Sequence, residues 1–455
     1  MSSSSSSPTM EQEGLNNEQS KPSFQVSGTS TSTQVVSNIN PTTKSSLLNT
    51  PTSVAVSHAV KMNKWSLLPM ELLNLIEESL ELYHDKVRLR CICSSWQSCL
   101  LKMPNHKQHQ LPWLLLPHSV GTSCAFFDSL EKKVHKVELP EAGEKVFKGS
   151  AYGWVVVAEK SGAIFLLNPL TRNKIKLPPR SKFPDVRKYR ADKVGNEYLI
   201  WVYSAVLAPG QYQSHDATHV LNYLLRKVIL SSSPTSMDFV AVALYGEYGH
   251  LAYCKLGDKK WSLIDNKFPT CDDIIFHEGQ LYALKCNGQL MVCDIDSCPK
   301  PIVTEVAPAY PRIQGGDMYL AGSSSGLMMV RRCIHVDRCS ISNEEIYTRK
   351  TLSFMIFKLD TSGRNWYQVQ SLGDDVLFLG LNSSLAISSH DYPVFKRNCI
   401  YFTDVNYNFG LKGTERPFDE GVFCLDEKKI EPLPTYSSDL NEVWPAPIWV
   451  TPNPY

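Results

Sequence analysis

The sequence predicts a mainly β protein in which a short helical segment separates a disordered tail from a large β domain. Residues 1–60 are rich in Ser, Thr, Asn, Gln and Pro and show neither helical nor strand periodicity. Apolar residues recur at helical spacing between residues 65 and 101. From Leu111 onward, short β-branched and aromatic runs alternate with Gly, Asn, Asp and Pro. We therefore expect three regions, at residues 1–60, 61–104 and 105–455.

The helical segment begins with a helix that starts at a proline. Pro69 suits the first helical position, because its missing N–H would have no partner there. Glu71 then lies in the first turn, against the positive end of the helix dipole. The apolar residues that follow share one face: Leu72, Leu73, Ile76 and Leu80. The pattern predicts an amphipathic helix.

A second helical stripe follows the first. Asp85 is a suitable N-cap, and the stripe after it consists of Leu89, Ile92, Cys93, Trp96 and Leu100. Ser94 and Ser95 interrupt this stripe, because serine competes for backbone hydrogen bonds and favours caps. We expect one helix to end near Cys93 and another to begin at Ser94 or Ser95, which makes three short helices.

This helical segment carries more apolar surface than it can hide. A piece of this size buries only about 60 % of the surface that its unfolded chain exposes. Chains of roughly 40 residues seldom fold alone without a metal, a disulfide or a partner. We infer that another protein covers the remaining apolar face.

The order of residues in the segment resembles an F-box. The matching positions are Leu68, Pro69, Leu72, Leu73, Ile76, Leu80, Asp85, Arg88, Arg90, Ile92, Cys93 and Trp96. The segment departs from the family pattern at Lys86, where an apolar residue is more frequent, and at Ile92, which replaces a common valine. The resemblance implies that the segment binds a Skp-type adaptor, which links it to a cullin and to the RING subunit of a ubiquitin ligase.

Carried onto this sequence, the resemblance places a set of residues at or beneath the adaptor interface. They are Leu68, Pro69, Leu72, Leu73, Ile76, Leu80, Val87, Leu89, Ile92 and Trp96. Some of them must form the internal core of the segment instead. Trp96 is either an interface hot spot or the residue that holds the helices together, and the sequence leaves both possibilities open.

The β domain shows a rough internal repeat. Each unit has an apolar run, a turn, a second apolar run, an Asp or Asn and then a Trp or another bulky residue. The clearest unit spans residues 273–294, where Glu278 and Gly279 predict a hairpin turn, and a less clear unit spans residues 198–230. About seven units recur at a spacing of roughly 40 to 55 residues, which is typical of four-stranded propeller blades. We predict a β-propeller of about seven blades in preference to a pair of β-sandwiches.

Both ends of the β domain carry apolar segments that are able to close a ring. Residues 448–450 are separated from residues 113–116 by the whole domain. In a closed ring these segments pair, or lie in neighbouring strands of one blade, and so remove exposed strand edges. We expect a chain that is cut after Trp444 to lose thermal stability.

Residues 112–455 resemble the C-terminal β-propeller domain of unknown function that follows the F-box in a large group of plant proteins. The match rests on residues 273–284, Asp294, residues 399–402, Asp404 and residues 447–452. It implies a substrate-recruiting domain with no known ligand and no catalytic residue. We assign no substrate-binding residue, but we expect recognition in the long connections at residues 208–218, 331–349 and 405–417.

Composition argues against nucleic-acid, membrane and metal binding. The 455 residues have a net charge of +1, and no run approaches the roughly 20 apolar residues that span a bilayer. The 13 cysteines lack disulfide-framework spacing and are typical of buried thiols in a reducing compartment. Cys333, His335 and Cys339 lack the second ligand pair of a zinc site. We expect a cytoplasmic or nuclear protein with no metal and no cofactor.

No catalytic motif is present. Residues 322–326 lack the Lys and the following helix of a phosphate-binding loop, so they indicate a turn between strands. The chain has neither a G-x-S-x-G elbow nor an H-E-x-x-H motif. Asp272 and Asp273 are adjacent, so on a strand they would point to opposite faces, and we expect them to cap a loop.

These observations predict a non-catalytic substrate-recognition subunit of an SCF-type (Skp–cullin–F-box) E3 ubiquitin ligase. Its helical segment would hold the ligase, and its propeller would present a target protein of unknown identity. Two alternatives remain open. One is a propeller that binds a small molecule or a sugar, which a deep acid-lined pocket would favour. The other is a non-degradative assembly factor that binds the Skp-type adaptor without a cullin.

Overall fold

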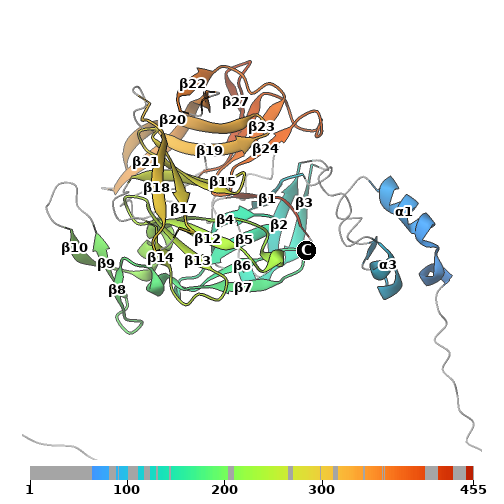
Figure 1. Ribbon diagram of the computed structural model, residues 1–455, viewed down its shortest axis with the longest axis horizontal. Helices are drawn as coiled ribbons and strands as arrows, with labels where there is room; N and C mark the ends of the chain where they lie inside the picture. Colours follow the sequence, from blue (N-terminus) through green and yellow to red (C-terminus); the bar gives the residue numbers. More distant parts are fainter. Residues whose placement is uncertain are drawn as a thin grey trace, which may run out of the picture. The chain divides into compact units, whose positions relative to one another are not determined.

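The computed structural model shows a small helical module and a β-propeller, which we describe separately (Figure 1). The described residues are 64–80, 89–90, 92–100, 111–116, 123–129, 132–142, 145–202, 210–264, 270–297, 299–310, 316–341, 344–360, 362, 364–404, 419–433 and 447–453. The predicted disordered tail at residues 1–60 lies outside them. No helix in these ranges is long and apolar enough to cross a membrane.

The helical module comprises the described residues between 64 and 100. Its elements are the 3-10 helix η1 (Lys64–Leu67) and the α-helices α1 (Met70–Ser79) and α3 (Ser94–Cys99). The ψ angle of Pro69 is 146°, so α1 begins one residue later than predicted, although Glu71 does lie in its first turn. Helix α3 begins at Ser94, as predicted. The proposed N-cap Asp85 lies outside the described residues.

Six sheets of the propeller have four or five strands within the described ranges. Sheet 1 contains β28 (Ile448–Val450), β1 (Trp113–Leu116), β2 (Ser123–Asp128) and β3 (Lys133–Glu138), in that order. Sheet 2 contains β4 (Val146–Ala151), β5 (Trp154–Ala158), β6 (Ile164–Leu167) and β7 (Lys174–Leu177). Sheet 3 contains β11 (Leu225–Leu230), β12 (Val240–Tyr245), β13 (His250–Lys255) and β14 (Ser262–Leu263).

The remaining three sheets follow in chain order. Sheet 4 contains β15 (Cys271–His277), β16 (Gln280–Lys285), β17 (Leu290–Asp294) and β18 (Ile302–Ala307). Sheet 5 contains β19 (Asp317–Ser323), β20 (Gly326–Ile341), β21 (Glu344–Leu359) and β22 (Trp366–Val369). Sheet 6 has the order β24 (Leu385–Ser388), β23 (Asp375–Leu379), β25 (Cys399–Phe402), β26 (Gly421–Cys424) and β27 (Lys429–Glu431).

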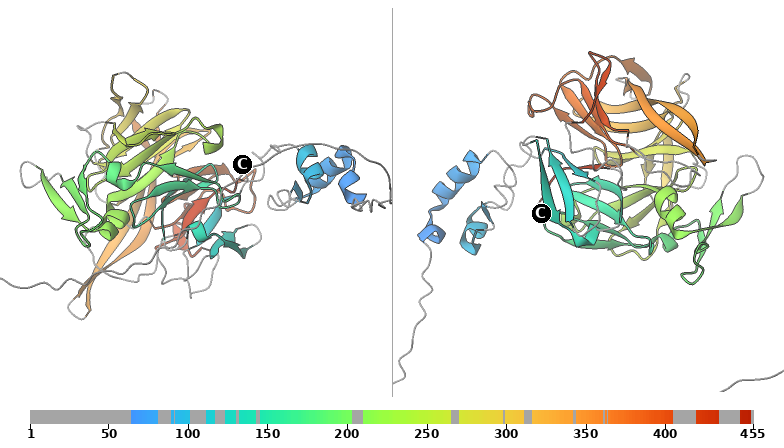
Figure 2. Two further views of the ribbon diagram at one scale, coloured as in Figure 1. Left: turned by 90° about the horizontal axis from the view of Figure 1, so that it is seen from below. Right: turned by 180° about the vertical axis from the view of Figure 1, so that it is seen from behind.

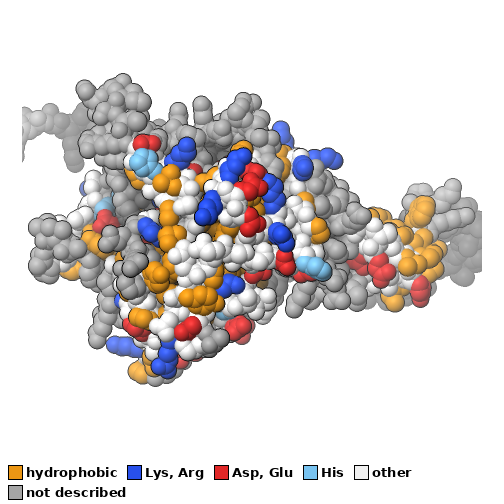
Figure 3. Space-filling model, turned by 90° about the horizontal axis from the view of Figure 1, so that it is seen from above, with side chains coloured by type: hydrophobic (Ala, Val, Ile, Leu, Met, Phe, Trp, Pro, Cys, Tyr) orange, Lys and Arg blue, Asp and Glu red, His pale blue; other side chains and the backbone are white. Residues whose placement is uncertain are grey.

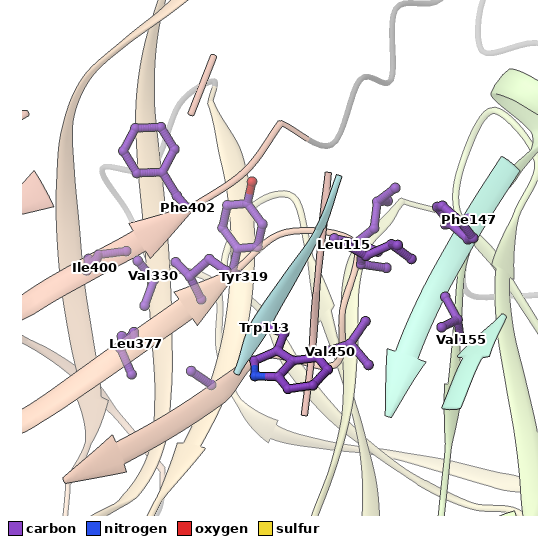
Figure 4. Packing of buried hydrophobic residues seen from close by; sticks show 14 of the residues in the cluster. Trp113, Leu115, Phe147, Val155, Tyr319, Val330, Leu377, Ile400, Phe402 and Val450 are labelled. Atoms are coloured by element: carbon purple, nitrogen blue, oxygen red, sulfur yellow. The ribbon is translucent and has the colours of Figure 1, made fainter. Parts of the chain in front are cut away.

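The sheets pack face to face, so their central strands are apolar on both sides. In β12, Ala241 and Ala243 pack against sheet 2, whereas Val242 and Leu244 pack against sheet 4. Because both faces of these central strands are buried, their sequences are continuous apolar runs. Figure 4 shows the largest cluster, which contains side chains of sheets 1, 2, 5 and 6. Leu115 belongs to sheet 1, Phe147 to sheet 2 and Phe402 to sheet 6.

A seventh sheet lies outside this ring and accounts for an error in the predicted blade count. This side sheet consists of β8 (Val186–Tyr189), β9 (Tyr198–Val202) and β10 (Gln211–His215), at the lower left of Figure 1. The side sheet has its own small core. It does not separate sheets 2 and 3, because Lys148 Nζ on β4 donates to Asn222 O, just before β11, at 3.0 Å. The less clear unit at residues 198–230 is therefore not a blade, and the ring formed by the described residues has six sheets instead of about seven.

Short helices connect several of these strands. They are η3 (Pro140–Ala142), η4 (Arg180–Lys182), α4 (Ala217–His219), the π-helix η5 (Val220–Leu224) and η6 (Pro234–Ser236). Asp216 caps α4, because its side chain accepts a hydrogen bond from His219 N at 2.8 Å.

The predicted closure of the ring by the C-terminal segment is confirmed. Strand β28 pairs antiparallel with β1, and the register places Trp449 opposite Leu114 and Ile448 opposite Leu115. Trp449 also packs edge-on against Phe378 of sheet 6, with ring centroids 5.0 Å apart. The last and first segments of the β domain therefore complete one sheet and join it to its neighbour.

Two predicted turns are confirmed. Strands β15 and β16 are joined at Glu278 and Gly279, whose φ angles of 48° and 77° are those of a type I′ hairpin. Strands β19 and β20 pair up to Ser323 and Gly326, which leaves a two-residue turn within residues 322–326.

The expectation that Asp272 and Asp273 cap a loop is wrong. Both lie within β15, beside a register shift that follows Cys271. Burial raises the pKa of Asp272 to about 6. Asp273 is buried and forms an ion pair, as described below. Their polarity suggested a loop because the sequence does not show which cation lies opposite them.

Candidate functional site

The helical module has a compact apolar core. Leu73, Leu89, Trp96 and Leu100 are at most 7 % exposed and form one cluster. The indole Nε1 of Trp96 donates to Trp65 O at 2.8 Å, which ties α3 to η1. The sequence allowed two positions for Trp96, at the interface or inside the module. Within the module, Trp96 has the internal position, where it holds the helices together.

A second set of apolar side chains on the module points to solvent, and we call this set the apolar surface. It consists of Trp65, Leu67, Met70, Leu72, Leu75 and Ile92, each between 48 and 67 % exposed. On α1, Leu72 and Leu75 are three residues apart and share a face, whereas the buried Leu73 lies on another. Figure 3 shows apolar side chains gathered on the module beside acidic ones.

The ten residues predicted at or beneath the adaptor interface divide into four groups. Leu73, Leu89 and Trp96 form the core of the module. Leu68, Ile76 and Leu80 are partly buried against that core. Pro69, Leu72 and Ile92 are exposed. Val87 lies outside the described residues.

Sequence reasoning missed four members of the apolar surface: Trp65, Leu67, Met70 and Leu75. The available signal was the presence of large apolar residues off the main helical stripe, since such residues have no core position to fill.

In the propeller, two deeply buried charged groups, the Lys227–Asp273 pair and Arg332, hold neighbouring sheets together. Lys227 Nζ on β11 contacts Asp273 Oδ1 on β15 at 2.6 Å, and both side chains are at most 3 % exposed. The other carboxylate oxygen, Asp273 Oδ2, accepts a hydrogen bond from Leu320 N on β19 at 2.9 Å. One carboxylate thus connects sheets 3, 4 and 5. The arrangement is structural, because the two side chains pair with each other and with the backbone of a third sheet.

Arg332 has a corresponding role between sheets 5 and 6. Its buried guanidinium lies 2.9 Å from Asp419 Oδ2 and donates to Thr403 O at 3.2 Å and to Thr351 Oγ1 at 2.6 Å. The guanidinium carbon also lies 4.7 Å from the centre of the Phe402 ring. Its donors are used within the propeller, where the group connects sheets 5 and 6.

Tryptophan side chains provide further bonds between sheets. Trp261 Nε1, beside β14 of sheet 3, donates to Pro178 O after β7 of sheet 2 at 2.8 Å. Trp366 Nε1 on β22 of sheet 5 donates to Gly288 O in sheet 4 at 2.9 Å. In these two repeats, the bulky residue that closes the repeat thus contacts the preceding sheet.

The long connections that we expected to carry recognition are only partly described. Residues 331–349 are not a loop, because β20 and β21 continue as a paired hairpin through most of them. Figure 2 shows this orange hairpin extending beyond its sheet. Residues 210–218 include β10 and the start of α4, and residues 405–417 lie outside the described ranges. Within the described chain, no group of three or more His, Cys, Asp and Glu residues is placed to hold a metal ion.

Lys148 makes the stability of the propeller depend on pH. Its side chain is 3 % exposed, and burial lowers the pKa of Lys148 from 10.5 to about 7. Between these two values the unfolded chain binds more protons at this residue than the folded chain, so stability rises with pH. We expect the free energy of unfolding of the wild type, measured with urea, to increase between pH 6 and pH 9. The increase should be smaller in Lys148→Met, which lacks the titrating group. Parallel pH profiles of the two proteins would contradict this.

The fold defines the class of protein. Six sheets are packed in a closed ring within the described part of the chain, and the C-terminal strand completes the first sheet. This arrangement is that of a β-propeller protein.

Comparison with known proteins identifies the family. The family model described as KIB1-4 beta-propeller matches residues 126–424, and the chain belongs to this family. F-box protein SKIP23 from Arabidopsis thaliana is 26 % identical over 412 residues, which cover 86 % of this chain and 96 % of the relative. F-box protein At2g17036 from the same plant is 26 % identical over 413 residues, with 86 % and 95 % covered. The predicted resemblance to plant F-box proteins with a C-terminal propeller is confirmed.

Proposed function

We propose that the chain is the substrate-recognition subunit of an SCF-type E3 ubiquitin ligase. The apolar surface of the helical module binds a Skp-type adaptor, and through it a cullin and a RING subunit. The propeller recruits a target protein. The observation that carries this proposal is the exposure of six large apolar side chains on a module with a core of only four buried residues. The names of the plant relatives support the same assignment.

The physical basis of adaptor binding is the removal of this apolar surface from water. Fully burying a Leu, Ile or Met side chain contributes about 1.5–3 kcal/mol. Leu72, Leu75 and Ile92 are roughly half exposed or more, so their burial against a partner yields a substantial share of the binding free energy. Trp65 adds a large aromatic side chain of the kind that dominates protein interfaces.

The propeller contributes no reacting group in this proposal. The buried charges at Asp273 and Arg332 are engaged between sheets, as described above. Ubiquitin transfer instead gains from proximity, because the chain holds its target near the ligase. The protein is thus a non-catalytic adaptor subunit that acts in the cytoplasm, the nucleus or both.

Substitutions on the apolar surface test adaptor binding. We expect Leu72→Asp and Leu75→Asp each to reduce co-purification of the Skp-type adaptor and the cullin at least tenfold, because a charge replaces an apolar contact. Ile302→Asp is the matched control, since Ile302 on β18 is 56 % exposed and lies in the propeller. Leu73→Asp is unsuitable, because Leu73 is fully buried and its substitution would unfold the module.

The same experiment separates the alternatives. Recovery of the adaptor without a cullin would favour a non-degradative assembly factor. Full recovery of both partners by Leu72→Asp and Leu75→Asp, with unchanged thermal unfolding of the propeller, would overturn the assignment of the apolar surface.

A further inference from the structure

The two faces of the side sheet, β8 to β10, differ in their packing. In β9, Tyr198 and Ile200 are buried and belong to the small core of this sheet. Leu199 and Trp201 alternate with them, are only partly buried, and belong neither to that core nor to the core between sheets 2 and 3. We call the face that carries Leu199 and Trp201 the outer face of the side sheet. The packing of the ring does not use it (Figure 1).

Strand pairing brings aromatic and basic side chains together on the outer face. Tyr212 on β10 lies directly opposite Trp201, and Lys188 on β8 lies opposite Leu199, so all four share this face. The rings of Trp201 and Tyr212 have centroids 4.9 Å apart. The guanidinium carbon of Arg187, on β8, lies 4.7 Å from the centre of the Tyr212 ring, which places Arg187 on the same face. Tyr212 is 40 % exposed, and Arg187 and Lys188 are exposed as well.

The two cations of the outer face have no carboxylate partner in the described part of the chain. Arg187 contacts the Tyr212 ring through a cation–π interaction, which uses none of its N–H donors. Lys188 forms no ion pair within the same part of the chain. A guanidinium group presents its donors in a fixed fork that matches the two oxygens of a carboxylate. These side chains are therefore able to receive an acidic partner without breaking an ion pair.

The charge of the side sheet favours a partner of this kind. Residues 186–216 contain four Lys and Arg residues and three Asp and Glu residues. Two of the acids are engaged internally, because Glu197 and Asp216 each accept a hydrogen bond from a backbone N–H of α4, at 3.1 and 2.8 Å. Residues 203–209, which join β9 to β10, include no charged residue. The side sheet thus carries a net positive charge, and its outer face holds two of the cations.

We propose that the outer face of the side sheet binds an acidic peptide segment of the target protein. This inference rests on the proposed function and names the surface and the class of target. Trp, Tyr and Arg are the residue types that dominate interface hot spots, and here Trp201, Tyr212 and Arg187 form one contiguous group. Carboxylates of the segment pair with Arg187 and Lys188, while an apolar side chain packs on the two rings. Single-stranded nucleic acid instead requires a basic groove that follows its backbone, which two cations do not form.

A random peptide library displayed on phage, selected on the full-length chain, tests this inference. The library is first depleted on the variant Arg187→Glu/Lys188→Glu, which removes peptides that bind elsewhere on the protein. We expect the peptides that remain to be enriched at least twofold in Asp and Glu over the unselected library. Fluorescence anisotropy then measures the affinity of the most enriched peptide. Arg187→Glu/Lys188→Glu should weaken it at least tenfold by charge repulsion, and Tyr212→Ala about five- to tenfold.

Lys259→Glu/Lys260→Glu is the matched control, because these adjacent lysines between β13 and β14 are also exposed and the change in charge is the same. The control should bind the peptide like the wild type. Equal losses in both double variants would overturn the inference, as would selection of no acidic peptides or equal affinity for a single-stranded oligothymidylate. The side-sheet variants should keep the thermal unfolding midpoint and the adaptor capture of the wild type. Failure of peptide binding is thus distinguishable from failure of the proposed function.

Discussion

Removal of residues 445–455 is expected to abolish the cooperative unfolding transition of the propeller. The deletion removes β28, whose side chains Ile448, Trp449 and Val450 are at most 3 % exposed. Burial of three such side chains contributes about 5–9 kcal/mol, at about 1.5–3 kcal/mol each. A natural domain has a total stability of only about 5–15 kcal/mol. Differential scanning calorimetry of the full-length and shortened chains measures the effect.

The control for this deletion is removal of residues 454–455 alone, which leaves β28 in place. We expect that chain to unfold like the full-length protein. An unchanged midpoint and enthalpy of unfolding after removal of residues 445–455 would show that β28 does not close the ring.

Lys227→Met is expected to destabilise the propeller by about 3–5 kcal/mol, because it leaves the buried carboxylate of Asp273 without its cation. The double variant Lys227→Met/Asp273→Asn should recover at least half of this loss. Asparagine is neutral and keeps an acceptor for Leu320 N, so no charge stays buried. Urea unfolding of the two single variants and the double variant forms a double-mutant cycle that measures the coupling.

An exposed ion pair provides the comparison for this cycle. Lys255 Nζ and Asp296 Oδ1 are 2.9 Å apart, but the two side chains are 55 and 75 % exposed. We expect Lys255→Met to change the stability by less than about 1 kcal/mol, because water screens the pair. Similar losses from Lys227→Met and Lys255→Met would mean that the burial of the Lys227–Asp273 pair has no energetic consequence.

Features set by short stretches of chain agree with the sequence-based predictions. The hairpin at Glu278 and Gly279 follows from the positive φ angles that such a turn requires. The start of α3 at Ser94 agrees with the interruption of the apolar stripe by two serines, although the N-cap position is Cys93 and its side chain forms no capping hydrogen bond. The pairing of β28 with β1 was also predictable, because apolar segments at the two ends of a β domain leave exposed edges unless they meet.

Features that depend on distant partners were predicted less well. The blade count was one too high, because β9 and β10 have strand patterns although they lie outside the ring. Asp273 appeared to be a loop residue, because its partner Lys227 belongs to another sheet. The residues predicted to bind the adaptor include both core and surface positions. Leu72 and Leu73 are adjacent apolar residues on one helix, and only the packing of the module shows that Leu73 is buried and Leu72 is exposed.

The local pattern of apolar, polar and turn-forming residues was sufficient to reveal the helical module, the strands and the repeated sheets, because secondary structure follows from the periodicity of neighbouring residues. Only the tertiary fold placed Ser150, Ser384 and Trp449 around one pocket. The first and last of these residues are 299 positions apart in the sequence. No local pattern encodes their meeting, since only ring closure brings them together.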